Sequence, residues 1–177
     1  LVVLAASLVL VDAPEVRLED LALGALAGVA AAIAYMLFLA AMTAGQMSVV
    51  APIAAATGAT VPAFYGLGFE DGPGGMAVIG IGVAIVAIVL VSSEEPTDEA
   101  TPPRAGVLAV LSGLFFGVFF VSLAFTSTDA GMWPLVASRS VSIPLLIVVN
   151  LSMNRGFIFD RSTLVRTAVA GLMEMVA

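Results

Sequence analysis

The chain has 177 residues, of which 61% are hydrophobic and 11% are charged, and its 13 acidic and 6 basic residues give a formal net charge of −7. Soluble domains are about 45–50% apolar and about 25% charged, so we expect lipid to solvate this apolar excess. The acidic balance argues against a nucleic-acid partner, and the lack of cysteine and histidine excludes disulfides, thiolate or imidazole catalysis and the usual zinc ligands.

Apolar runs between polar clusters predict an all-helical polytopic membrane protein with five complete spans and two partial ones. The complete spans are predicted at residues 21–43, 49–68, 75–91, 105–126 and 132–153. Each is close to the ~20 residues that a helix needs to cross ~30 Å of hydrocarbon. Residues 1–11 predict the second half of an earlier span, and the run from about residue 164 predicts the start of a later one. We therefore expect a piece of a longer protein.

The alternative to membrane spans is a set of buried core helices in a large soluble protein. Such helices carry polar residues that recur with helical period, whereas residues 23–41 offer only Tyr35. The apolar runs therefore favour the membrane.

Short polar segments connect the predicted spans. Residues 12–20 combine a proline turn with acids at the start of the next helix, where the helix dipole favours negative charge. Glycine-bearing turns at residues 44–48 and 69–74 are typical of connections between antiparallel neighbours.

An acidic, proline-rich linker at residues 94–104 divides the chain into residues 1–93 and 105–177. Its acids lie on a segment without an apolar face, so a solvated linker is favoured over a site for acid/base chemistry. A weak internal repeat, with an offset of 143 residues, places residues 25–28 over residues 168–171 and favours two related halves.

Two glycine pairs have the spacing of close helix contacts. They are Gly24-x-x-x-Gly28 and Gly113-x-x-x-Gly117. Small residues let helix backbones approach in lipid, where no hydrophobic force holds helices together. We expect tight packing between helices of one chain rather than a dedicated dimer motif.

A proline pair and one carboxylate are the candidates for a functional site within the membrane. Pro52 and Pro62 share a predicted span with Thr57 between them, so several carbonyl groups of that helix lose their N–H partners. This pattern predicts either a helix beside a solute path or a structural kink. Glu174 lies about ten residues into its predicted helix and is a candidate coupling or substrate-site residue; the alternative is a structural pair with a polar group on a span outside this sequence.

Arg139 and Trp133 are predicted to anchor the bundle. Arg139 lies near a predicted interface, within reach of headgroups by snorkelling, and Trp133 is typical of the interfacial aromatic belt. No Ser-His-Asp set, metal-ligand cluster, P-loop or GxGxxG motif occurs, so we expect no enzyme activity, no cofactor and no metal.

Two stretches carry the features of a known family. Residues 37–56 read LFLAAMTAGQMSVVAPIAAA, and the run 79–92 is rich in glycine and β-branched residues. Together they resemble the EamA-type repeat of the drug/metabolite transporter superfamily. The second part of the chain, with Arg139 in its second span and the run AGLME ending at Glu174, resembles the start of the next repeat. The first part of the chain departs from the family at Gly58, where the family often has proline.

The resemblance implies two inverted five-helix repeats that carry small metabolites or drugs across the membrane by alternating access. On this map, residues 1–93 form a first repeat without its first helix, and residues 105–177 form the start of a second repeat that is truncated in its third helix. The implied partners are a small-molecule solute and the bilayer of the cell (plasma) membrane, and the coupling ion is not identified.

Two arrangements across the membrane stay open. Arg104, Arg155, Arg161 and Arg166 fall on one side and Arg17 on the other, so the positive-inside rule places the linker in the cytoplasm. The family's usual arrangement, with both termini cytoplasmic, places the linker outside.

We therefore expect a secondary carrier whose solute path lies nearest to Tyr35, Pro52, Thr57, Pro62 and Glu174. A membrane scaffold or sensor subunit without transport explains the same composition, and it predicts polar groups paired within the spans and no wet cavity. An intramembrane enzyme would need a nucleophile or metal cluster on helices outside this sequence.

Overall fold

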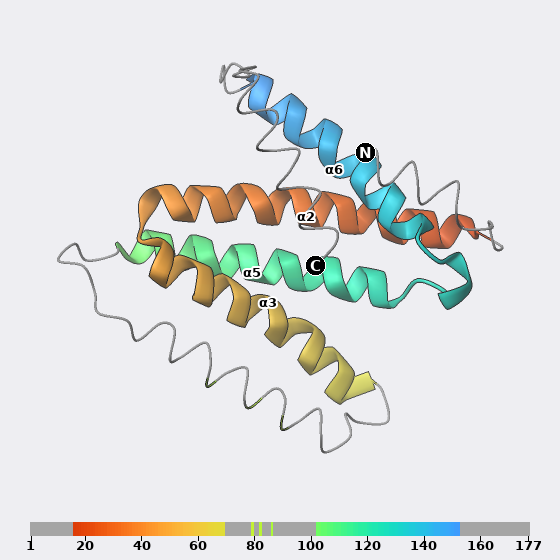
Figure 1. Cartoon of the computed structure of the whole chain (residues 1–177), viewed down its shortest axis with the longest axis horizontal. Coiled ribbons are helices and arrows are strands. Elements are labelled where there is room, and N and C mark those ends of the chain that lie inside the picture. Colours follow the sequence, from red (N-terminus) through yellow and green to blue (C-terminus); the bar gives the residue numbers. More distant parts are fainter. Residues whose placement is uncertain (1–15, 70–78, 80–81, 83–85, 87–101, 153–177) are drawn as a thin grey trace, which may run out of the picture.

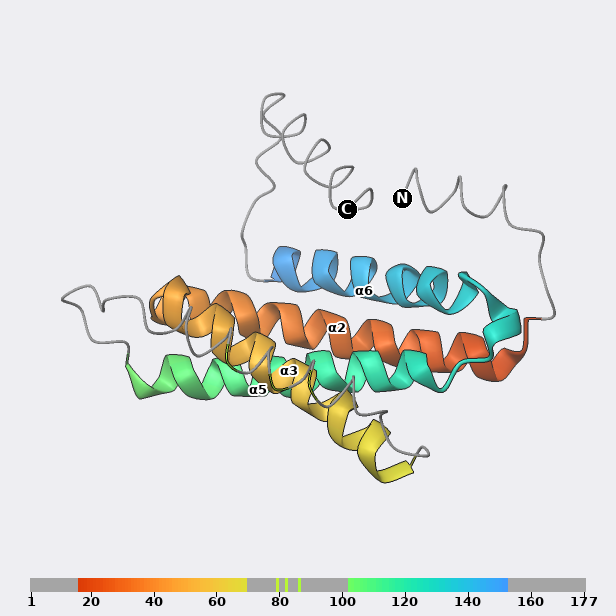
Figure 2. The ribbon, with the colours of Figure 1, turned by 60° about the horizontal axis from the view of Figure 1, so that its bottom comes forward.

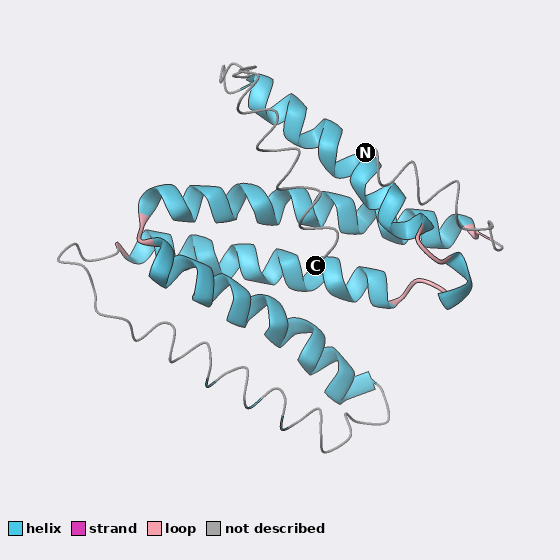
Figure 3. Ribbon diagram, in the orientation of Figure 1, coloured by secondary structure: helices cyan, strands magenta, loops and turns pink. Residues whose placement is uncertain are grey.

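The computed structural model describes residues 16–69, 79, 82, 86 and 102–152 (Figure 1). The elements of this part are α2 (Leu18–Ala44), α3 (Met47–Phe69), α5 (Pro103–Ala124), the one-turn 3-10 helix η1 (Thr128–Ala130) and α6 (Trp133–Ser152). Short turns join α2 to α3 and α5 to α6 (Figure 3). Each of the four long helices is apolar and long enough to cross a membrane. The described part is therefore that of an all-helical integral membrane protein.

The four long helices confirm four of the predicted complete spans, with ends that differ by a few residues. α2 begins at Leu18 rather than at residue 21 because Glu19 and Asp20 form its first turn, where the helix dipole accommodates acids. α5 begins at Pro103, since proline fits the first helical position without losing a hydrogen bond.

Several predicted features lie outside the described residues. They include the partial spans at residues 1–11 and from about 164, residues 94–101 of the linker at 94–104, and Glu174. Of the predicted span at residues 75–91, Ile79, Gly82 and Val86 are described, and all three are helical.

α2 and α5 run antiparallel and form the centre of the described bundle. Ser112 Oγ of α5 donates to the Ala34 carbonyl of α2 at 2.9 Å, and Ser127 N, after the end of α5, donates to Asp20 Oδ1 near the start of α2 at 2.8 Å. α6 packs on α2 and α3 packs on α5, so the order across the bundle is α6, α2, α5, α3 (Figure 1). The turned view shows α3 crossing α5 (Figure 2).

α2 and α6 run parallel and touch through their backbones. A Cβ atom added at Gly24 would overlap the backbone of Pro134, and one added at Gly28 would overlap the backbone of Ser138. Both α6 residues are buried. The first glycine pair therefore makes a contact within the chain, as the sequence predicts.

α3 and α5 also run parallel. A Cβ atom at Gly113 would lie 2.6 Å from the Thr57 side chain, and one at Gly117 would overlap the side chain of Val61. The prediction of tight packing within one chain is thus confirmed for both glycine pairs. Because α3 and α5 point the same way, α3 ends and α5 begins at opposite ends of the bundle.

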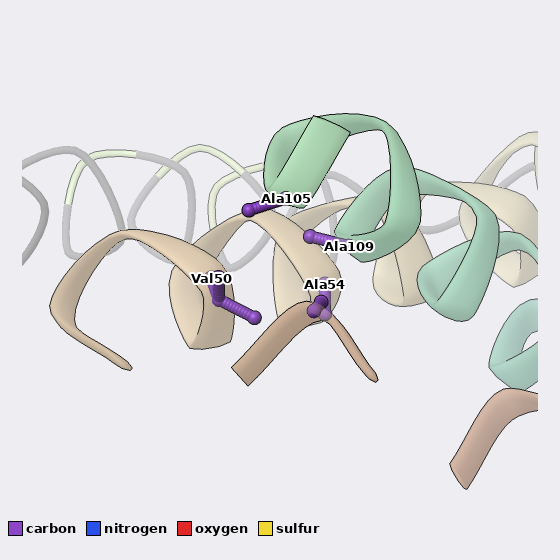
Figure 4. Packing of buried hydrophobic residues seen from close by; sticks show 5 residues of the cluster. Val50, Ala54, Ala105 and Ala109 are labelled. Carbon is purple, nitrogen blue, oxygen red and sulfur yellow. The ribbon is translucent and has the colours of Figure 1, made fainter. Parts of the chain in front are cut away.

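Small side chains fill the contacts between helices, and large apolar ones point outward. The cluster where α2, α3 and α5 meet consists of Ala41, Val50, Ala54, Ala105 and Ala109 (Figure 4). The exposed large side chains include Leu18, Leu26, Leu39, Phe64, Phe120, Val148 and Leu151. A soluble protein shows the opposite distribution, whereas close approach at small residues is what holds helices together in lipid. The packing therefore agrees with a bilayer as the solvent.

Candidate functional site

Two grooves flank the C-terminal half of α2, and Tyr35 lines both. The α2–α6 groove has a volume of about 400 Å³, and its described lining includes Tyr35, Leu39, Thr43, Leu146, Val149 and Asn150. The α2–α3–α5 groove has a volume of about 450 Å³, and its described lining includes Tyr35, Phe38, Ala54, Gly58, Phe116 and Phe120.

The positions of the grooves follow from where the helices touch. α6 contacts α2 at Gly24 and Gly28 and diverges from it toward the C-terminal end of α6 (Figure 1). α3 meets α2 near Val50, close to its own start, and then follows α5. Because each outer helix leaves α2 beyond its contact, space opens on both sides of residues 35–43.

Three polar side chains give the α2–α6 groove its capacity for hydrogen bonding. The side chain of Tyr35 is 49% exposed. Thr43 Oγ1 donates to the Ala40 carbonyl at 2.9 Å, which leaves its lone pairs free to accept. Asn150 Oδ1 is buried without a hydrogen-bond partner in the described part of the chain, and an unmatched buried acceptor destabilises a state by about 1–3 kcal/mol. This groove can therefore bind a polar group on an otherwise apolar solute.

The α2–α3–α5 groove is apolar and aromatic. Its rings come from Tyr35, Phe38, Phe116 and Phe120. Gly58 also lies on its wall, and Pro62, one turn later within α3, has no N–H to donate to the Gly58 carbonyl. The groove thus offers aromatic surface, and the carbonyl of Gly58, a residue of its wall, lacks its regular helical donor.

The other predicted path residues of α3 lie beside this groove and not among its described lining residues. Pro52 is buried and Pro62 is partly buried. Thr57 Oγ1 donates to the Ile53 carbonyl of its own helix at 2.8 Å, and the Thr57 side chain packs against α5. Glu174 lies outside the described residues. A role for these four residues in a solute path stays a prediction.

The two predicted anchors both belong to α6. Trp133 is its first residue and is partly buried, and Arg139 is exposed. At 1.5 Å per residue, Arg139 lies about 9 Å along the helix from Trp133, a distance that a long arginine side chain can span to reach a membrane surface. Anchoring by both residues stays a prediction.

One buried carboxylate is absent from the predicted site residues. Asp20 is 3% exposed, its Oδ1 accepts the Ser127 N–H, and its Oδ2 is buried without a partner among the described residues. In the sequence, Asp20 is one acid in the first turn of a helix, next to Glu19. Its burial arises because the turn around Ser127, 107 residues later, folds over it, and the local pattern gives no sign of that contact.

Comparisons of the chain with protein-family models, with curated proteins and with solved structures find no match. The protein class is therefore assigned from the helices of the chain itself. The described residues define an all-helical membrane protein with two grooves beside one central helix.

Proposed function

We propose that this chain is part of a secondary carrier that moves small organic solutes across the cell membrane by alternating access, with the two grooves beside Tyr35 as its solute path. The observation that carries the proposal is the position of Tyr35, a half-exposed hydroxyl-bearing ring within an apolar span and on the wall of both grooves. A polar group that faces hydrocarbon lacks a hydrogen-bond partner, whereas a water-filled path solvates it.

Two further polar groups support a path. Asn150 has a buried acceptor without a partner in the described part, and the Gly58 carbonyl loses its helical donor to Pro62. Each acceptor lacks a regular donor among the described residues, and water or a solute that enters the path would supply one. A scaffold or sensor subunit would instead pair such groups within the bundle, so these groups favour the carrier.

Alternating access requires that the same helices pack in two alternative arrangements, each of which opens the path to one side of the membrane. The contact of α6 with α2 at Gly24 and Gly28 has no interlocking side chain on the α2 side. Such a smooth contact can act as a pivot on which α6 rocks, closing or widening the α2–α6 groove. The EamA-type architecture, in which an inverted second repeat supplies the other moving half, forms part of the same proposal.

Solute flux into vesicles tests the proposal. Full-length protein would be reconstituted, and radiolabelled amino acids, nucleosides and sugars would be screened for counterflow. For a transported solute we expect Tyr35→Leu to lower the flux roughly tenfold, the effect of losing one hydrogen bond of about 1.4 kcal/mol.

Val29→Leu is the matched control, because Val29 lies on the same helix, is 37% exposed and is not among the described lining residues of either groove. We expect it to leave the flux unchanged. Equal flux in the two variants would contradict the assigned path, and no flux of any solute would favour the scaffold or sensor.

A further inference from the structure

The α2–α6 groove is polar at one end and apolar along its length. Tyr35, Leu39 and Thr43 follow one another at intervals of four residues, so they form a row along one face of α2. Because α2 and α6 run parallel, Thr43 and Asn150, each near the C-terminal end of its helix, lie at the same end of the groove. Tyr35 lies about 12 Å from that end, at 1.5 Å per residue of α2. The groove therefore suits an elongated solute whose polar group lies beside Thr43 and Asn150.

Two oxygen atoms at the polar end accept hydrogen bonds. Asn150 Oδ1 is buried with no partner in the described part of the chain. The Thr43 hydroxyl gives its one proton to the Ala40 carbonyl at 2.9 Å, so toward a solute it can only accept. A solute would therefore have to supply an N–H or O–H donor here. One that only accepts hydrogen bonds would leave Asn150 Oδ1 unsatisfied, which destabilises a complex by about 1–3 kcal/mol.

The described lining of the α2–α6 groove contains no acidic or basic side chain. An ion in the groove would lose water without gaining a counter-charge, which is far less favourable than the desolvation of a neutral amide or hydroxyl group. A lipid acyl chain carries no donor, so it would leave Asn150 Oδ1 unpaired. The volume of about 400 Å³ is within the range of about 300–1,000 Å³ that is typical of sites for small molecules.

We propose that the α2–α6 groove binds uncharged, elongated solutes that have an apolar body and an N–H or O–H donor at one end, such as primary amides and alcohols. The donor binds Asn150 Oδ1 and Thr43 Oγ1. The apolar body lies along Leu39 and Val149 toward Tyr35. In the carrier proposed above, on which this last step rests, this class of solute is the transported substrate.

Four probes with one chain length test the donor and the charge separately. They are octanamide, the methyl ketone in which a methyl group replaces the amide nitrogen, octanoate and octylammonium. Binding of radiolabelled octanamide to the full-length protein in lipid nanodiscs would be measured by equilibrium dialysis, with the other three as competitors and empty nanodiscs to correct for partitioning into lipid. We expect saturable binding of octanamide. The ketone and both ions should each bind roughly tenfold more weakly or worse, the effect of one lost hydrogen bond or of an unmatched charge.

Substitution of the two acceptors tests the assigned contacts. We expect Asn150→Leu to remove most of the tenfold preference for octanamide over the ketone. Thr43→Val has nearly the same shape as threonine, should reduce the preference less, and carries the test if Asn150→Leu does not fold. Val148→Leu is the matched control on α6, because Val148 is 62% exposed and is not among the described lining residues of the groove. It should keep the full preference. A preference that stays tenfold in the folded acceptor variants would overturn the assigned contacts.

Three results with the native protein would overturn the proposal itself. Equal competition by the ketone would remove the need for a donor, and stronger competition by either ion would remove the uncharged class. Absence of saturable octanamide binding, the result expected if lipid or another segment of the chain fills the groove, would remove the site.

The binding measurements need no transport, so they separate this inference from the proposed function. A protein that shows the preference for octanamide but moves no solute refutes the carrier and leaves the binding site. A protein that transports only charged solutes and shows no such preference refutes the binding site and leaves the carrier.

Discussion

Ser127 forms two hydrogen bonds that fix the α5–α6 turn. Its N–H donates to Asp20 Oδ1 at 2.8 Å, and its Oγ accepts from the Asp129 N–H at 3.2 Å, which caps η1. The φ angle of Ser127 is −64°, close to the value that proline adopts. Substitution at this one position can therefore remove the side-chain bond alone or both bonds together.

Ser127→Ala removes the side-chain cap and keeps the N–H, whereas Ser127→Pro removes both. We expect Ser127→Pro to lower the free energy of unfolding by about 1.5–3 kcal/mol more than Ser127→Ala, since a hydrogen bond to a charged group contributes about this much. Unfolding in detergent, followed by circular dichroism, measures the difference. Equal destabilisation by the two variants would show that the N–H contributes nothing.

A residue of the candidate site could be predicted where the local sequence marks it, and could not be predicted where its role depends on contacts with distant residues. Tyr35 is recognisable as a polar residue in an apolar run, and it lines both grooves. The burial of Asp20 depends on a turn 107 residues away. The importance of Asn150 depends on the divergence of α6 from α2, which no local pattern encodes.

At the scale of helices, glycine positions decide which faces touch. α5 contains one glycine that another helix contacts closely and one that faces open space. A Cβ atom at Gly113 would lie 2.6 Å from the Ala54 carbonyl oxygen of α3, and one at Gly106 would have nothing within 4 Å. Both positions carry glycine in the same helix, and they differ in whether a neighbouring helix lies against them.

We expect Gly113→Ala to lower the free energy of unfolding by about 1–3 kcal/mol, because the added methyl group overpacks a backbone contact between α3 and α5. Gly106→Ala should raise it, by at most about 1 kcal/mol, because alanine is the better helix former. Thermal unfolding in detergent measures both. A gain in stability from Gly113→Ala would contradict the close packing of α3 on α5.

The existence and length of the helices could be predicted, because an apolar run of membrane-spanning length has few other solutions. Their arrangement could not. Both glycine pairs predict a close contact, but the spacing does not say that Gly24 and Gly28 meet α6 while Gly113 and Gly117 meet α3. The grooves depend on which helices touch, so they could not be predicted from the sequence pattern.

At the scale of the whole molecule, the directions of the helices assign each exposed helix end to one side of the membrane. The starts of α3 and α5 lie at the same end of the bundle, since Val50 and Ala105 belong to one cluster. The start of α2 lies at the other end, beside the turn at Ser127.

Single cysteines test this assignment in a chain that has none of its own. Met47 and Arg104 are exposed at one end of the bundle, and Arg17 and Thr128 are exposed at the other. We expect a membrane-impermeant maleimide to label Met47→Cys and Arg104→Cys from one side, and Arg17→Cys and Thr128→Cys from the opposite side. Labelling of Met47→Cys and Arg17→Cys from the same side would contradict the arrangement of α2 and α3.

The central claim is that water enters the bundle beside Tyr35, and the reactivity of cysteines on α2 tests it most directly. Tyr35→Cys lies on the wall of both grooves, whereas Val29→Cys lies on an exposed face of the same helix and is not among the described lining residues of either. In vesicles, we predict that a hydrophilic thiol reagent reacts with Tyr35→Cys and leaves Val29→Cys in lipid unmodified. A Tyr35→Cys variant that is as unreactive as Val29→Cys would contradict a solute path along α2.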